Sequence, residues 1–405
     1  MEDDKTLRDL NDRVYQVNPK FGNGNRKRYV EKSTNDLNKN EKNTLVAGDK
    51  HFQVISTENG RWGFQGMAVA PIINGNPDYN QVTVVAAGTD PNDKLDVLEA
   101  VDGATNIGSL QEPVAEKFVD KMMRQHPDWK IMQLTGYSQS AYMLKVGAKY
   151  QIPTVTFNGW FQYGTLTSEE KIFMKNNANF FTNYRKKEDA VTWWNDFNSS
   201  SFNSDDFGTV VWLAGKSHNL SDWQFDKTGM IILPDNPETQ SAIKAQKERL
   251  LQVQLAKHMS RLTVIKRQLT ASGGGLSTNE KLYLDSEASR IIVQKLASDF
   301  KLATEKLIAI YQTAITEAKE LWQNTLYESR SMGTLLTEWE VRETLQMVGF
   351  TEQTVITNPC YTYQDKLTKI MTVASDFDRL TNEITAKISE IVQRDSDLAY
   401  QLKGI

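Results

Sequence analysis

The 405-residue sequence has a single cysteine, Cys360, and only four histidines. One cysteine excludes an internal disulfide, and one thiol cannot build a thiolate metal site. No stretch approaches the roughly 18 apolar residues of a membrane-spanning helix. The opening residues, Met1-Glu-Asp-Asp-Lys5, lack the basic and apolar segments of a secretory signal peptide. Composition therefore predicts a soluble protein, either cytoplasmic or exported without a signal peptide.

The sequence also lacks an excess of basic charge. Its formal net charge is −4, and lysine and arginine form no stripe. Because phosphate binding needs clustered cations, nucleic acid is not an expected partner. Hydrophobic residues make up 39% of the chain and aromatic residues 10%, which indicates a folded protein long enough for two domains.

Proline and tryptophan are scarce in the last part of the chain. Seven of the nine tryptophans precede Pro237, and Pro359 is the only proline after it. This shift predicts a mixed α/β domain over residues 1–235 and a long-helix domain over residues 236–405, joined near Pro234–Pro237.

The first domain has alternating strand and helix patterns. Asn59-Gly60 favours a tight hairpin turn between the first two strands. Strands that alternate with helices predict a mostly parallel sheet covered on both faces, with ligands beyond the carboxyl ends of the strands. The predicted strands are 51–57, 61–71, 81–87, 130–135, 154–157, 180–184 and 209–213, and the predicted helices are 113–126, 139–150 and 168–175.

The second domain is predicted to be all-α and elongated. One helical stripe ends at the glycines of 272–275, a second helix covers about 279–327, and a third covers about 364–402. The third helix repeats apolar residues at steps of three and four over more than four heptads. A one-sided stripe of this length needs partners, either the neighbouring helices or another chain.

The segment Thr135-Gly-Tyr-Ser-Gln-Ser-Ala141 places a serine between a predicted strand and a predicted helix. A nucleophile elbow requires small residues two positions before and two positions after its serine, and Gly136 and Ser140 meet this requirement. The helix N-terminus favours the negative charge that develops during acyl transfer. We therefore predict Ser138 to be a catalytic nucleophile.

A serine nucleophile needs a base and a carboxylate. His218, in the loop after the strand 209–213, is the only histidine that follows Ser138 within the first domain. Asp189, just past the strand 180–184, would orient the imidazole and stabilise its cation. The competing carboxylates are Glu188, Asp196, Asp205 and Asp206.

An oxyanion hole should combine the backbone N–H of the residue after the nucleophile with one from the loop after an earlier strand. These requirements predict Gln139 and Thr89, because Thr89 follows the strand-ending turn of Val84-Val-Ala-Ala-Gly-Thr89.

Five segments resemble the bacterial class-3-type lipase family over most of residues 7–225. The resemblance implies an α/β-hydrolase fold, a serine carboxylic-ester hydrolase and the order Ser138, Asp189, His218. The family usually has Gly-His-Ser-Leu-Gly at the elbow, so Tyr137, Gln139 and Ser140 depart from its pattern. The segments are Tyr15-Gln-Val-Asn-Pro, Gly63-Phe-Gln-Gly-Met-Ala-Val-Ala, Val84-Val-Ala-Ala-Gly-Thr, Gly136-Tyr-Ser-Gln-Ser and Thr154-Val-Thr-Phe-Asn.

A lipase domain followed by a helical domain also resembles type VII-secreted lipase toxins of reversed order, in which an LXG-like targeting domain comes last. This resemblance implies export without a signal peptide, small α-helical secretion-partner proteins that bind the C-terminal domain, and an immunity protein. Tyr361–Asp365 fits the Tyr-x-x-x-Asp export pattern, and Tyr283–Glu287 fits its glutamate variant.

The leading hypothesis is an antibacterial lipase or phospholipase that hydrolyses membrane-lipid acyl esters and needs no metal or organic cofactor. One alternative is a catalytically inactive hydrolase-like scaffold, favoured by the altered elbow. Another is an intracellular esterase for small esters, which leaves the long helical domain unexplained.

Overall fold

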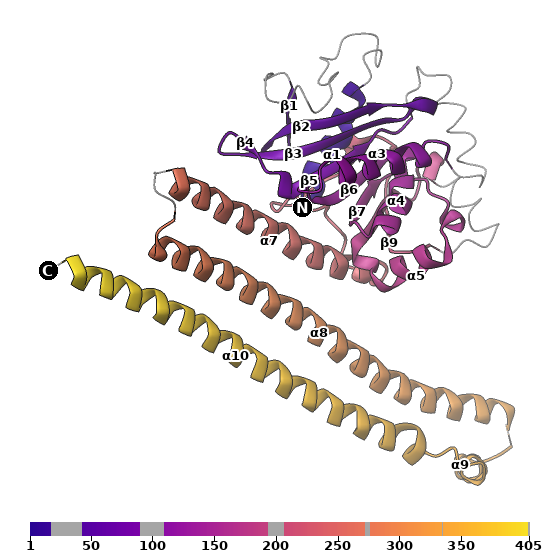
Figure 1. The fold of residues 1–405 in the computed structure, drawn as a ribbon. Helices are drawn as coiled ribbons and strands as arrows, with labels where there is room; N and C mark the ends of the chain where they lie inside the picture. The colour runs from indigo at the N-terminus through magenta and orange to yellow at the C-terminus, as the bar shows by residue number, and fades with distance from the viewer. Residues whose placement is uncertain (18–42, 90–108, 193–205, 272–275, 334, 404–405) are drawn as a thin grey trace. The chain divides into compact units, whose positions relative to one another are not determined.

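A computed structural model describes residues 1–17, 43–89, 109–192, 206–271, 276–333 and 335–403 (Figure 1). Contacts divide the chain into two compact units, Met1–Ile265 and Lys266–Ile405. The first unit is a mixed α/β domain, and the second consists of long packed helices.

The described part of the first unit contains a nine-stranded mixed sheet in the order β1-β2-β3-β5-β6-β7-β8-β9, with β4 paired to β3. The pairs from β1 to β5 are antiparallel, and those from β5 to β9 are parallel. The strands are β1 (Thr44–Ala47), β2 (Lys50–Asn59), β3 (Gln65–Ile73), β4 (Asn76–Pro77), β5 (Val82–Ala86), β6 (Ile131–Tyr137), β7 (Thr154–Phe157), β8 (Phe181–Lys186) and β9 (Thr209–Leu213).

Side chains that alternate along the strands form a separate core on each face of the sheet. On β3, Met67 and Val69 join one cluster, and Ala68 and Ala70 join the other. The first cluster packs under α1 (Asp4–Arg13). The second packs under α3 (Glu112–Gln125) and α4 (Met143–Tyr150), while α5 (Ser168–Asn176) packs against α4 in a third cluster. The sheet is thus covered by helices on both faces.

The parallel strands β5 to β9 neighbour one another in chain order, so their carboxyl ends meet at one edge of the sheet. The expected strands 154–157 and 209–213 match β7 and β9, and the other expected strands overlap observed ones. A mostly parallel sheet with helices on both faces is therefore confirmed.

The predicted tight turn at Asn59-Gly60 is wrong. Asn59 pairs with Gln65, so the connection contains five residues and a short 3₁₀ helix, Arg61–Gly63. The Gly60 N–H donates to the Phe64 carbonyl at 2.8 Å and closes this wider loop. The alternating pattern was interpreted as a strand from residue 61 onward, so the short helix Arg61–Gly63 was missed.

Helix α7 (Gln240–Ala271) belongs largely to the first unit. Its Arg249 lies 2.7 Å from the Asp4 carboxylate and donates to the Tyr184 hydroxyl at 2.7 Å. Tyr184 in turn donates to Asp4, and all three side chains are buried. This ion pair ties α7 to α1 and β8, so the contact division falls after Ile265, later than the predicted boundary after residue 235.

The second unit contains α8 (Thr278–Met332), α9 (Glu338–Met347) and α10 (Asn358–Lys403). Helices α8 and α10 pack antiparallel, because ring contacts join Phe300 to Phe377 and Tyr311 to Tyr363. The two long helices were predicted with shorter bounds. The ten-residue α9 was not predicted, and its capping box, Thr337 with Glu340, was the available sequence signal.

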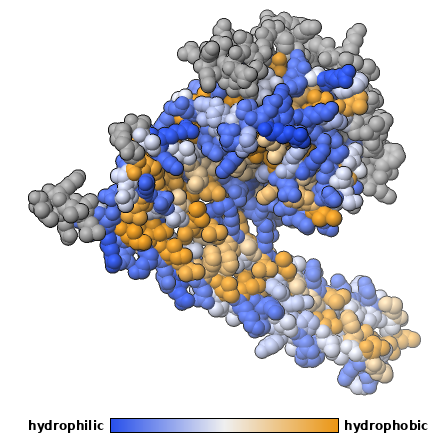
Figure 2. Space-filling model, viewed as in Figure 1, coloured by the Kyte–Doolittle hydropathy of each residue, from blue (hydrophilic) through white to orange (hydrophobic). Residues whose placement is uncertain are grey.

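The apolar stripe of α10 divides into two rows. Ile370, Phe377 and Ile388 are partly buried, and Phe377 stacks on α8. A second row, Val373, Leu380, Ile384 and Ile391, stays exposed, from 39% for Ile384 to 54% for Val373. Figure 2 shows hydrophobic residues interspersed with polar ones along these helices. The hairpin alone therefore leaves one apolar row uncovered.

Among the described residues, no helix has an apolar segment of the length and composition needed to cross a bilayer.

The buried contact between α7 and α1 gives a stability prediction. Arg249→Leu leaves the Asp4 carboxylate buried without its cation, so we expect a loss of about 3–5 kcal/mol in unfolding free energy. Urea denaturation measures this loss. Lys244→Ala, at an exposed position of the same helix, should change the free energy by less than about 0.5 kcal/mol. Equal stability of the two variants would contradict the assigned role of Arg249.

Candidate active site

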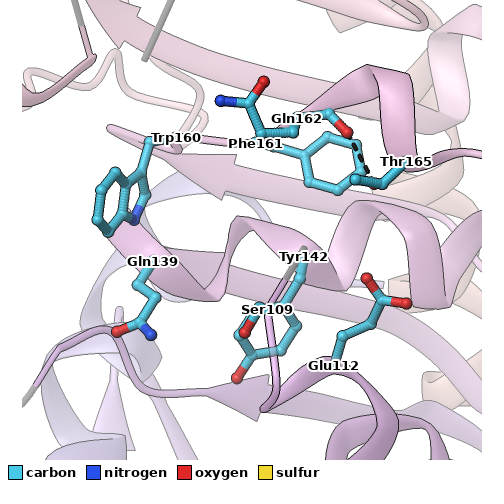
Figure 3. Close-up of a pocket in the computed structure, with 8 residues that line it drawn as sticks. All are labelled: Ser109, Glu112, Gln139, Tyr142, Trp160, Phe161, Gln162 and Thr165. Carbon is cyan, nitrogen blue, oxygen red and sulfur yellow. Dashed lines mark hydrogen bonds between the residues drawn. The ribbon is translucent and has the colours of Figure 1, made fainter. Parts of the chain in front are cut away.

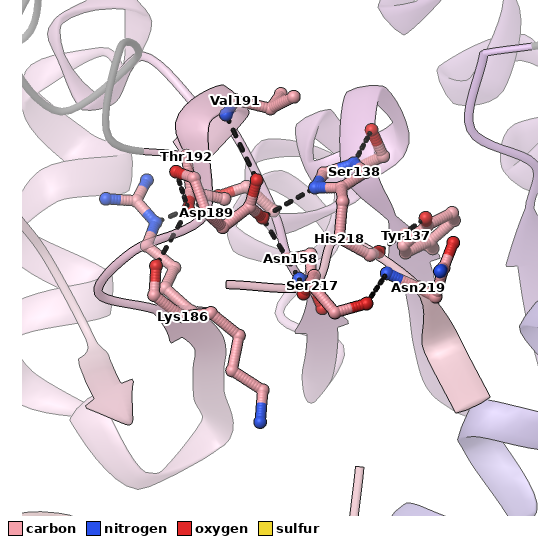
Figure 4. A network of polar contacts seen from close by, with 12 residues as sticks. Tyr137, Ser138, Asn158, Lys186, Asp189, Val191, Thr192, Ser217, His218 and Asn219 are labelled. Carbon is pink, nitrogen blue, oxygen red and sulfur yellow. Dashed lines mark hydrogen bonds and ion pairs between the residues drawn. The ribbon is translucent and has the colours of Figure 1, made fainter. Parts of the chain in front are cut away.

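The predicted site residues lie where successive parallel strands end. Ser138 follows β6, Asp189 follows β8 and His218 follows β9 (Figure 4). Since these strands share one carboxyl edge, three residues distant in the sequence come together. This is the position in which open parallel sheets hold their ligands.

Ser138 occupies a sharp turn between β6 and a 3₁₀ helix, Ser138–Tyr142, that leads into α4. Its φ of 57° lies in the left-handed region, which is strained for a residue with a side chain. The turn is tight enough that a Cβ at Gly136 would lie 2.3 Å from the Ser140 carbonyl oxygen. Glycine is therefore required at position 136, and the predicted strand-turn-helix arrangement is present.

Ser140 has a defined role in this turn. Its Oγ accepts a hydrogen bond from the Tyr137 N–H at 2.7 Å and donates to the Ala86 carbonyl at 2.8 Å. The hydroxyl therefore ties the turn to the end of β5. Serine in place of glycine at this position therefore adds hydrogen bonds that stabilise the elbow turn.

Ser138, His218 and Asp189 form a continuous chain of hydrogen-bonding contacts. The Ser138 Oγ lies 2.7 Å from His218 Nε2, and His218 Nδ1 lies 2.6 Å from Asp189 Oδ2. Asp189 is almost wholly buried, at 1% exposure, whereas a quarter of the His218 side chain is exposed. The carboxylate can therefore fix the imidazole, whose other nitrogen reaches the serine hydroxyl.

The electrostatics favour an ionised Asp189. Burial alone would raise its pKa, but contacts with His218, the Asn158 amide and the Val191 N–H together bring the pKa below the usual aspartate range. Val191 donates its N–H to Oδ1 at 3.0 Å, and Asn158 donates to Oδ2 at 3.1 Å. The carboxylate is thus held charged opposite the imidazole.

Asn158 is a site residue that sequence reasoning missed. It follows β7 with a φ of 48°, and its Nδ2 donates to Asp189 and to the Ser217 carbonyl. Its Oδ1 accepts from the buried Trp223 indole N–H at 2.8 Å. One amide therefore joins the Asp189 loop to the His218 loop. A polar residue directly after a buried parallel strand was the available signal.

Tyr137 also supports the site. Its hydroxyl donates to the His218 backbone carbonyl at 2.7 Å, and its ring lies 5.3 Å from the imidazole ring, centroid to centroid. Burial, and then the nearby Asp189 charge, raise the pKa of Tyr137, so its hydroxyl remains a protonated donor. Sequence reasoning recorded Tyr137 only as a departure from a family pattern.

The two predicted oxyanion residues lie in contact. The Thr89 hydroxyl donates to the Gln139 Oε1 at 2.7 Å. The end of β5 reaches the elbow closely, because a Cβ at Gly88 would lie 2.6 Å from the Tyr137 carbonyl oxygen. The side chains of Thr89 and of the residue after the nucleophile are therefore in contact beside the elbow.

Asp189, rather than its competitors, is the carboxylate that His218 contacts. Glu188 and Asp206 are exposed, and Asp196 and Asp205 lie outside the described residues. Of the other histidines, His126 stacks on Trp129 with 3.8 Å between ring centroids.

The lowered pKa of Asp189 gives a pH prediction. A carboxyl whose folded pKa is depressed stabilises the fold above its unfolded pKa of about 4, and this stabilisation is lost as the pH falls through the folded value. The difference in unfolding free energy between the parent and Asp189→Asn should therefore shrink as the pH is lowered below about 4. Urea denaturation at several pH values measures it. A difference that stays constant or grows below pH 4 would contradict preferential ionisation of Asp189.

No protein-family model matches this chain, and a search of curated proteins gave no match.

Proposed function

We propose that this protein is a serine carboxylic-ester hydrolase with an α/β-hydrolase fold, acting as a lipase or phospholipase on acyl esters of membrane lipids. The observation that carries the proposal is the contact chain from Ser138 Oγ through His218 to the buried Asp189. This chain stands at the carboxyl edge of a parallel sheet, on a strained strand-turn-helix elbow.

The proposed reaction begins at the Ser138 Oγ, which attacks the acyl carbonyl carbon while His218 Nε2 takes its proton. Asp189 holds the imidazole and stabilises the cation that forms. The backbone N–H groups of Gln139 and Thr89 bind the oxyanion. Collapse of the intermediate expels the alcohol, which takes the proton from His218. Water, activated by His218, then hydrolyses the acyl-enzyme and releases the fatty acid.

The inactive-scaffold alternative drew its support from the altered elbow. Ser140 keeps the turn closed through two hydrogen bonds, and Tyr137 fixes the His218 loop. Two of the three departures from the family pattern, Ser140 and Tyr137, therefore help to hold Ser138 and His218 in place. These contacts favour an active enzyme over an inactive scaffold.

The helical second unit fits a role in export better than a role in catalysis. A small-ester enzyme of the cytoplasm would have no use for the exposed row of Val373, Leu380, Ile384 and Ile391 on α10. An amphipathic helix docks through such a row, with anchors three, four and seven residues apart. We therefore assign this row to small α-helical secretion-partner proteins of a type VII route. An antibacterial role would also require an immunity protein in the producing cell.

The catalytic proposal predicts loss of fatty-acid release in Ser138→Ala. The parent should release fatty acid from vesicles of phospholipid with added diacylglycerol, and the variant should lose on the order of 10⁴-fold or more of this rate, because the nucleophile is gone. Ser168→Ala, at an exposed position of α5, should keep the parent rate. Undiminished release by Ser138→Ala would remove Ser138 from the mechanism. No release by the parent, with no activity on short-chain esters, would favour the scaffold alternative.

The export proposal predicts that Leu380→Glu with Ile384→Glu reduces the protein recovered from the medium of producing cells, because two charges enter the exposed apolar row. Asn382→Glu adds charge at an exposed polar position of the same helix and should not reduce export. Circular dichroism checks that both variants stay helical. Export of the double variant at the parent level would exclude this row as the docking surface.

A further inference from the structure

A small pocket lies beside the nucleophile, between the elbow and the segment after β7 (Figure 3). Its volume is about 20 Å³, enough for one group the size of a water molecule. Its lining includes Glu112, Gln139, Trp160 and Gln162. Gln139 directly follows Ser138, and Trp160 donates its backbone N–H to the Ser138 carbonyl at 3.3 Å. Two residues of the pocket lining, Gln139 and Trp160, are therefore linked directly to the Ser138 backbone.

Buried donors in this lining lack acceptors. The Gln139 Nε2 and the Trp160 Nε1 have no hydrogen-bond partner within the described part of the chain. Gln139 is only 3% exposed, and its other amide atom, Oε1, is held by the Thr89 hydroxyl. Gln162, 4% exposed, also carries a side-chain amide without a described partner. A buried polar group without a partner is destabilising, so these donors favour binding of an oxygen atom from a ligand.

The charges of the lining residues indicate which kind of ligand oxygen the pocket can accept. Glu112, the charged side chain among the described lining residues, is an acid paired with Lys145 at 2.6 Å. No lysine or arginine is among the described lining residues, and Lys145 is already paired with Glu112, so the described lining offers a phosphate no unpaired cation. A phosphate headgroup is also too large for a space that holds one water. A hydroxyl group carries no charge and is small enough for this space.

We propose that Gln139 and Trp160 form a subsite for a neutral hydroxyl group of the substrate, close to the scissile ester. This inference rests on the proposed ester hydrolysis and narrows its substrate class to hydroxyl-bearing esters. Such a hydroxyl can belong to the glycerol of a partial glyceride or to the acyl chain of a hydroxy-fatty acid. Both sources present an uncharged hydroxyl oxygen to a lining in which the Gln139 and Trp160 side-chain N–H groups have no described acceptor. O-methylation would enlarge that oxygen beyond the space of the pocket.

The test compares kcat/KM within two substrate pairs on the full chain. One pair is a monoacylglycerol and its di-O-methyl ether, and the other is a 3-hydroxyacyl methyl ester and its 3-methoxy form. The parent should prefer the hydroxyl member of at least one pair by about tenfold. Gln139→Leu and Trp160→Phe should each reduce that preference about three- to tenfold, because each removes one hydrogen bond. Gln125→Leu, the same substitution at an exposed position of α3, should keep it. The pair that loses its preference identifies the source of the hydroxyl.

Two results would overturn the subsite. One is equal use of both members of each pair by the parent, and the other is a preference that both variants retain. If Ser138-dependent hydrolysis is absent, the proposed function fails on its own. Calorimetric binding of two non-hydrolysable probes, a 1-O-alkylglycerol and a 3-hydroxyacyl amide, then decides the subsite. Binding of either probe to the parent that weakens in Gln139→Leu supports the subsite, and binding of neither overturns it.

Discussion

The parallel pairing of β5 to β9 in chain order is the constraint on which the rest of the site depends. It carries five consecutive strand ends to one edge of the sheet. Thr89 follows the first of these strands, Ser138 the second, Asn158 the third, Asp189 the fourth and His218 the fifth. The order Ser, Asp, His is therefore a direct result of topology, and a change in strand order would separate these side chains.

Local contacts then bring these strand ends to bonding distance. The strained φ of Ser138 presents its hydroxyl, and Ser140 anchors the turn to β5. Asn158 joins the loops of Asp189 and His218 through its side-chain amide, and Tyr137 donates a hydrogen bond to the His218 backbone carbonyl. These supporting groups are buried or partly buried, so they hold Ser138, His218 and Asp189 in place from within the fold. This preorganisation is what ester hydrolysis by a serine requires.

Sequence patterns predicted the sheet, its parallel half and the three residues in contact, because each leaves a local signature. A buried strand followed by a small-residue turn and a helix identified Ser138, and position in the chain identified His218 and Asp189. Asn158 could be noticed from its place after a buried strand, but neither its partners nor the partner of Arg249 were predictable, because these contacts join residues distant in the sequence. For the same reason the sequence placed the domain boundary before α7, whose contacts with the first unit include a buried ion pair with Asp4 and a hydrogen bond from Gln246 to the Ile231 carbonyl. On α10 the apolar repeat was recognised, but periodicity alone could not divide it into a packed row and an exposed row.

The central claim is that His218 and Asp189 activate Ser138, and covalent labelling tests it most directly. A fluorophosphonate probe reacts with an activated serine, whose Oγ displaces fluoride and forms a bond to phosphorus. Intact-mass and peptide mass spectrometry should find one probe on the parent protein, on Ser138, and almost none on His218→Ala. A parent protein that stays unlabelled, or labelling of Ser138 that survives the loss of His218, would contradict the account.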